Sequence, residues 1–210
     1  MKKANLLNRV KHLEKSLDYL KKDLCKALRE KEILEEKNWE LKEALKKLKR
    51  ISTTDFMTGL GNKMAFNETF ESSIENYLIN GKKFTLVIID LNDLKKVNDI
   101  EGHEKGDNLI KSAAGLMQHA IRNNDYAFRI GGDEFAIILS GTENGKPFEK
   151  RLHSLAEKSN ISLSIGWAST SHVKKGSTSQ STIKEILFNF ADSNMYLQKS
   201  LYKKKDLHRQ

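Results

Sequence analysis

Two adjacent carboxylates, Asp133 and Glu134, follow a pair of glycines at residues 131–132. Apolar, β-prone runs at residues 126–130 and 135–139 flank this tetrad, a pattern that predicts a β-hairpin whose turn uses the positive φ that glycine adopts easily. One acid is enough to close an ordinary surface turn, and a second adjacent acid adds electrostatic repulsion. The pair therefore indicates either a solvated turn or a site for a cation.

A third carboxylate, Asp90, ends an apolar run rich in β-branched residues at 84–89. Such a run is typical of a strand buried on both faces. An acid at its end loses solvation unless it is paired or bound to a metal. Together with the hairpin acids, Asp90 could hold Mg²⁺, which takes oxygen ligands and often keeps a phosphate as a further ligand. Carboxylates that gather such ions on a sheet suit in-line attack at phosphorus, so the chemistry indicated is nucleotidyl transfer.

Five segments extend this pattern along the chain. They are Asp-Phe-Met-Thr-Gly-Leu-Gly-Asn-Lys at residues 55–63, the block at 90–107 that begins Asp-Leu-Asn-Asp, Arg-Ile-Gly-Gly-Asp-Glu-Phe at 129–135, Ser-Leu-Ser-Ile-Gly at 162–166, and Ala-Asp-Ser-Asn-Met-Tyr at 191–196. In this order they resemble the motifs of GGDEF-domain diguanylate cyclases, which condense two GTP into cyclic di-GMP and pyrophosphate. The resemblance implies an α+β fold similar to the palm of nucleotidyl cyclases and polymerases, with a central, mainly antiparallel sheet flanked by helices.

The resemblance also implies catalytic and metal-binding roles. Asp90 and Asp133 would ligate Mg²⁺ or Mn²⁺, and the carbonyl of Leu91 would complete the site. Glu134, the second acid of the motif, would assist metal binding or activation of the 3′-hydroxyl. Asn92 stands where many members have aspartate, which removes one acid near the metals.

Guanine recognition is implied for Asn98 and Asp107, which match the family's base-reading positions. A carboxylate accepts both N1–H and N2–H of guanine, a pair of donors that adenine does not offer. Asp107 therefore makes GTP, rather than ATP, the expected substrate.

Phosphate binding is implied for two further groups of residues. The backbone amides of Asp93 and Leu94 would cradle phosphates as helix N-termini do, with Lys95 beside them. Lys199 and Lys203 lie one helical turn apart and match the lysine and arginine that grip the terminal phosphates. Lys203 lacks the bidentate fork of that arginine, and the Gly-Arg-Asn sequence that usually ends the domain is absent.

Arg122 and Asp125 match the family's Arg-x-x-Asp inhibitory site, five residues before the Gly-Gly-Asp-Glu-Phe motif. By resemblance, Arg122 would bind guanine or phosphate of cyclic di-GMP, and Asp125 would read a guanine edge. The product is therefore also the expected feedback inhibitor. Since any helix end can contain this spacing, an ordinary helix terminus is the alternative interpretation.

Residues 6–48 contain a heptad repeat without glycine or proline. The d positions are Leu6, Leu13, Leu20, Ala27, Leu34, Leu41 and Leu48, and the a positions are Val10, Leu17, Leu24, Lys31, Asn38 and Leu45. This pattern predicts a coiled coil, and the polar a residues favour a dimer; a helix packed on its own domain is the alternative. We expect residues 1–50 to form a parallel dimerisation helix and 51–210 the GGDEF domain, with a hinge at 51–61.

The remaining elements follow from periodicity. Apolar spacing predicts a helix at 62–80 with an inward face, helices near 94–100, 108–121 and 148–158, a strand at 161–168, and a polar loop at 172–180. The inward residues of the first helix are Met64, Phe66, Phe70, Ile74 and Leu78. A possible capping box from Thr182 to Glu185 opens the last helix.

Charge and cysteine content narrow the possible partners. The formal net charge of +9 is concentrated at the two ends of the chain, with a slight acidic excess between them, so we expect no nucleic-acid domain. A single cysteine excludes an internal disulfide. No apolar stretch has the length of a signal core or a membrane span, and the expected location is the cytoplasm.

Three functions fit these features to different degrees. An active homodimeric diguanylate cyclase uses all of the acids. A catalytically silent receptor for cyclic di-GMP or GTP usually has a degenerate motif, which this chain lacks. A structural or nucleic-acid adaptor built on the basic coiled coil leaves Asp90, Asp107, Asp133 and Glu134 unexplained.

Overall fold

The computed structural model describes residues 2–173 and 179–207, and the chain divides into two compact units, Met1–Ile51 and Ser52–Gln210. Helix α1 (Lys2–Thr53) makes up the first unit and ends just beyond it. The helix therefore continues through Thr53, two residues past the break expected at residue 51; that the following segment acts as a hinge remains a prediction. Among the described helices, none is long and apolar enough to cross a membrane.

Along α1, the seam leucines with described side chains are all exposed, by 55–67%. They are Leu13, Leu17, Leu20, Leu24, Leu34, Leu41, Leu45 and Leu48. The side chains of Leu6 and Val10 lie outside the described part. At the polar a position, Lys31 pairs with Glu35 one turn later, at 3.5 Å. A single α1 therefore presents an apolar stripe to solvent, as a coiled-coil strand without its partner does.

The second unit is built on a four-stranded antiparallel sheet in the order β2-β3-β1-β4. The strands are β1 (Phe84–Leu91), β2 (Tyr126–Arg129), β3 (Glu134–Ser140) and β4 (Leu163–Ser169). β1 is central and every one of its residues is buried. The mixed helical and antiparallel fold and the doubly buried strand are confirmed.

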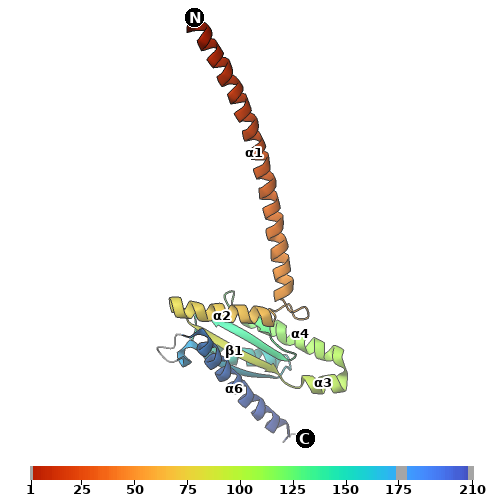
Figure 1. Ribbon diagram of the computed structural model, residues 1–210. Coiled ribbons are helices and arrows are strands. Elements are labelled where there is room, and N and C mark those ends of the chain that lie inside the picture. Colours follow the sequence, from red (N-terminus) through yellow and green to blue (C-terminus); the bar gives the residue numbers. More distant parts are fainter. Residues whose placement is uncertain (1, 174–178, 208–210) are drawn as a thin grey trace. The chain divides into compact units, whose positions relative to one another are not determined.

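Helices cover both faces of this sheet (Figure 1). Alternate β1 residues Leu86 and Ile88 face α2 (Lys63–Asn80) and α6 (Gln180–Leu207). Val87 and Ile89 face α4 (His103–Ala120) and α5 (Lys146–Lys158). The short helix α3 (Leu94–Glu101) packs against α4, and the 3₁₀ turn η1 (Thr170–His172) follows β4. The period of two along β1 therefore fixes which helices each side chain meets.

Several local predictions are wrong. Met64 and Leu78 are 51% and 37% exposed, so the buried face of α2 is narrower than its apolar spacing suggests. The helix expected from residue 108 begins at His103. Because α6 begins at Gln180, Thr182 lies inside its first turn, and the capping box at 182–185 does not open the helix. Residues 174–178 of the polar loop lie outside the described part.

Candidate functional site

Asp90 is a buried carboxylate at the end of the central strand, with 3% of its surface exposed. Its even-numbered position places it on the face covered by α6, where Lys199 Nζ lies 2.5 Å from Asp90 Oδ2. The other oxygen, Oδ1, is buried and has no hydrogen-bond partner in the described part of the chain. Buried polar atoms are nearly always satisfied, so this oxygen is the atom that most needs a ligand.

The electrostatic balance at Asp90 matches this geometry. Burial raises the pKa of Asp90, the Lys199 ammonium opposes the rise, and the nearby charge of Asp133 adds to it. Lys203 opposes it more weakly. A further cation beside Asp90 and Asp133 would relieve both the burial and the repulsion between the two acids.

The hairpin turn is bonded to the end of β1. The amide of Leu91 donates to the carbonyl of Asp133 at 2.9 Å, and Asp90 pairs in register with Glu134. The expected positive φ is wrong, since neither Gly131 nor Gly132 has it. The side chain of Glu134 folds back over the turn, since its Oε2 would lie 2.5 Å from a Cβ at residue 131.

Arg129 braces the same turn from β2. Its guanidinium donates to the carbonyl of Gly132 at 2.9 Å and contacts the Asp55 carboxylate at 3.4 Å. Asp55 also accepts hydrogen bonds from the amide and hydroxyl of Thr58. Burial alone would raise the pKa of Asp55, but the Thr58 hydrogen bonds and the Arg129 charge together lower it below its usual value. The segment after α1 is thus bonded to the carboxylate-bearing turn.

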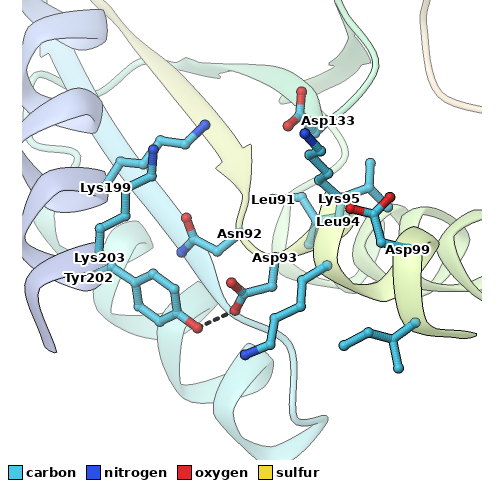
Figure 2. A pocket seen from close by; sticks show the side chains of 12 residues that line it. Leu91, Asn92, Asp93, Leu94, Lys95, Asp99, Asp133, Lys199, Tyr202 and Lys203 are labelled. Carbon is cyan, nitrogen blue, oxygen red and sulfur yellow. Dashed lines mark hydrogen bonds between the residues drawn. The ribbon is translucent and has the colours of Figure 1, made fainter. Parts of the chain in front are cut away.

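A cavity of about 750 Å³ opens beside these residues (Figure 2). Its lining comes from the end of β1, from α3, from the hairpin and from α6, and comprises Leu91, Asn92, Asp93, Leu94, Lys95, Lys96, Asp99, Ile100, Asp133, Lys199, Tyr202 and Lys203. Seven residues expected from the sequence therefore lie together: Leu91, Asp93, Leu94, Lys95, Asp133, Lys199 and Lys203. Lysines from two of these elements, Lys95 and Lys96 of α3 and Lys199 and Lys203 of α6, line the cavity and suit a polyanionic ligand.

The position of α6 depends on two features of β4. A Cβ on Gly166 would lie 2.0 Å from the carbonyl oxygen of Ala191, so only glycine allows the helix backbone to approach this closely. Next to Lys199, the side chain of Gln198 accepts from the amide of Ile165 at 3.0 Å and donates to buried Glu149 at 2.8 Å. These contacts fix the rotation of α6 and with it the lysines.

The two predicted base-reading residues do not line this cavity. Asn98 and Asp107 are half-buried on α3 and α4. A Cβ on Gly106 would lie 1.9 Å from Asn98 Oδ1, so the asparagine side chain packs against the first turn of α4, beside Asp107. Their assignment as guanine readers remains a prediction.

Asn92 has a structural role that the sequence did not reveal. It is 5% exposed, its amide nitrogen donates to Ser162 Oγ at 3.0 Å, and its amide oxygen accepts from Ser164 Oγ at 2.9 Å. The amide thus joins the end of β1 to the start of β4. An aspartate at this position could accept from both serines but could not donate.

Arg122 and Asp125 lie at the other end of the sheet, around a small cavity of about 90 Å³ that is also lined by Arg151. Asp125 Oδ2 accepts from the amide of Arg122 and Oδ1 from the amide of Ser140, both at 3.0 Å. Each oxygen of Asp125 therefore already has a backbone partner. Arg151 was not anticipated, because nothing in its sequence spacing connects it to residues 122–125.

The donors around Asp90 fit Mg²⁺ or Mn²⁺ by type. An unpartnered carboxylate oxygen, a second carboxylate on Asp133 and the Leu91 carbonyl are the hard oxygen ligands that such ions take, with phosphate oxygens as the rest. Within the described residues, however, no three His, Cys, Asp or Glu side chains gather closely enough to hold a metal. The chain therefore brings two acids to this point, and any further ligands of a metal ion would have to come from outside them.

Comparison with known proteins gives a consistent result. Residues 52–205 match the family described as "Diguanylate cyclase, GGDEF domain". The diguanylate cyclase DgcS of Shewanella oneidensis is 30% identical over 153 residues, which are 70% of this chain and 49% of that protein. The probable diguanylate cyclase DgcJ of Escherichia coli is 35% identical over 123 residues, 56% of this chain and 25% of that protein. The chain thus spans half or less of the length of these relatives.

Solved structures agree in fold. The coiled coil and GGDEF domain of DgcB from Caulobacter crescentus, solved with c-di-GMP, superposes with a TM-score of 0.66 at 24% identity, covering 78% of this chain and 89% of that one. SiaD from Pseudomonas aeruginosa, solved with its activator SiaC, gives a TM-score of 0.73 at 24% identity and covers 92% and 75% of the two chains. By its sequence match over residues 52–205, the chain belongs to the GGDEF-domain diguanylate cyclase family.

Proposed function

We propose that this protein is an active diguanylate cyclase, which condenses two GTP into cyclic di-GMP and releases two pyrophosphates. The observation that carries the proposal is the unpartnered, buried oxygen of Asp90 beside a lysine-lined cavity. A domain that had lost catalysis would have little reason to keep a buried acid short of a ligand, because such a group costs stability.

The residues around the cavity divide the work. Lys95, Lys199 and Lys203 bind the triphosphate, and the amides of Asp93 and Leu94 hold its phosphates at the start of α3. Asp107, with Asn98, selects guanine. Mg²⁺ or Mn²⁺ held by Asp90, Asp133 and the Leu91 carbonyl would stabilise the attacking and leaving oxygens.

In each half-reaction, the 3′-hydroxyl of one GTP attacks the α-phosphorus of the other. The bond between the α-phosphorus and the bridging oxygen breaks, and pyrophosphate leaves. Glu134 is exposed at the hairpin and is the carboxylate available to take the hydroxyl proton. The same step in the opposite direction closes the ring, so two sites have to face each other.

A homodimer through α1 would bring the two sites together. The exposed leucine seam supports a parallel coiled coil, which raises the local concentration of the second domain without adding a contact at the site. Deleting residues 1–48 should give a monomer whose specific activity is low at nanomolar protein and recovers at high concentration. A truncated protein that stays dimeric and fully active at nanomolar concentration would contradict this function of the coil.

The reaction itself is tested by incubating the purified protein with GTP and Mg²⁺ and resolving the nucleotides by chromatography. We expect cyclic di-GMP from GTP, no product from ATP, and no product after Asp133→Ala or Glu134→Ala. Unchanged folding of both variants, checked by circular dichroism, is the control. Wild-type rates in the Glu134→Ala protein would contradict the assigned site.

A product site at Arg122 and Asp125 is the second proposal, supported by the small cavity that these residues share with Arg151. Cyclic di-GMP bound there would act as a feedback inhibitor. A protein that binds cyclic di-GMP by calorimetry yet makes none from GTP would instead be a silent receptor.

A further inference from the structure

Tyr202 is a wall residue of the cavity that resemblance to the family did not predict. It follows Lys199 by three residues and precedes Lys203, so the three side chains share one face of α6. Its hydroxyl donates a hydrogen bond to Asp93 Oδ2 across the cavity, as Figure 2 shows.

Asp93 has a backbone conformation that needs support. Its φ of 63° and ψ of 8° are left-handed, and among described residues other than glycine only Asn160 shares a positive φ. Aspartate tolerates this region better than most residues, but at a cost. The side chain makes no capping hydrogen bond to α3, although the Asp93 carbonyl accepts from the amide of Val97 at 2.9 Å. The carboxylate is instead bonded to Tyr202.

We propose that Tyr202 is a positioning residue for the triphosphate, an inference that rests on the proposed function. Its hydroxyl holds residue 93 in the left-handed conformation from which the first turn of α3 starts, and so presets the amides of Asp93 and Leu94. α6 thus contributes two lysines that bind phosphate and one tyrosine that shapes the turn opposite.

Calorimetric titration with a non-hydrolysable GTP analogue and Mg²⁺ tests the inference. We expect Tyr202→Phe to weaken binding about tenfold, the usual scale for a lost hydrogen bond to a charged group. In an Asp93→Gly background the same substitution should change affinity less than twofold, because glycine adopts the left-handed conformation freely and has no carboxylate. Tyr196→Phe is the matched control, since Tyr196 is 65% exposed on the same helix.

Steady-state kinetics separate positioning from a general structural effect. Tyr202→Phe should raise KM for GTP about tenfold and leave kcat within twofold, because the lost contact precedes chemistry. Wild-type affinity in Tyr202→Phe would overturn the inference. An equal loss of affinity with and without Asp93→Gly would also overturn it, since Tyr202 would then contact the nucleotide directly.

Nucleotide-free unfolding distinguishes this inference from the proposed function. If the unmodified protein did not bind the GTP analogue, the proposed function would fail. The Tyr202–Asp93 hydrogen bond would still predict that Tyr202→Phe lowers Tm in the unmodified background and has no effect in Asp93→Gly. If the changes in Tm of Tyr202→Phe and Asp93→Gly simply added in the double variant, the two residues would not be coupled, and the positioning role of Tyr202 would fail as well.

Discussion

The two ends of the central sheet each bury an aspartate, and the two aspartates differ in what surrounds them. Asp90, at the end of β1, has one oxygen on Lys199 and the other without a partner in the described structure. Asp125, near the start of β1 and the end of β3, has both oxygens on backbone amides. Their exposures are similar, at 3% and 9%. Burial alone therefore does not separate a functional acid from a structural one, whereas the identity of the partners does.

Asp90→Asn gives the largest expected effect. Removing the charge should lower the initial rate of cyclic di-GMP formation at least about a thousandfold, because a metal ligand and its electrostatic stabilisation are lost. Stability should stay the same or rise, since a buried charge without full compensation is removed and half-exposed Lys199 can be solvated. Initial rates measure the loss of activity, and thermal unfolding measures the change in stability. A loss of both stability and activity would place Asp90 with the structural acids.

Asp125→Ala should show the opposite pattern. The amides of Arg122 and Ser140 would lose a partly buried acceptor, and the free energy of unfolding should fall by about 1–3 kcal/mol. Initial rates should change less than twofold. Arg122→Ala is the control, because it keeps the backbone amide and should keep stability while weakening cyclic di-GMP binding. Urea unfolding of both variants measures these changes in stability. Equal stability of Asp125→Ala and the unmodified protein would refute the structural role of Asp125.

Asp55 extends the comparison to pH. Since its pKa is lowered in the folded state, its stabilising contribution is complete above the unfolded value and is lost as pH falls through the folded value. The stability difference between the unmodified protein and Asp55→Asn should therefore be largest near neutrality and shrink below about pH 4. Urea titrations from pH 3 to 7 measure it. The pKa of Asp90 is raised, so its ionised form destabilises the folded protein. This unfavourable contribution to the free energy of unfolding should shrink as pH falls.

Lys203→Arg gives the smallest expected effect. A guanidinium could bind phosphate oxygens through two parallel hydrogen bonds where the ammonium acts as a point charge. We expect a two- to fivefold gain, roughly, in affinity for the GTP analogue by calorimetry, with no change in Tm. Unchanged affinity would mean that Lys203, although it lines the cavity, does not contact the phosphates.

The sequence predicted the sheet well and individual contacts less well. The apolar run of β1 and the two apolar runs that flank the hairpin turn predict strands from local sequence alone. The predicted ends of these strands were therefore correct within about two residues. The partners of Asp125 are backbone amides, which have no sequence signal. Tyr202 and Asp93 are 109 residues apart, and their contact depends on how closely α6 approaches β4. Met64 and Leu78 have helical spacing but lie beyond the edge of the buried face.

One consequence follows for truncated forms of the protein. Gly61 donates to the carbonyl of Ala127 at 3.1 Å and accepts from the amide of Arg129 at 2.8 Å, and a Cβ at residue 61 would lie 2.4 Å from the ring of Phe128. This one residue therefore occupies two of the backbone groups that the edge strand β2 would otherwise offer to another chain. Open strand edges are templates for aggregation. A fragment that begins after Gly61 would keep every catalytic side chain but would expose these two backbone groups of β2 to pairing with another chain.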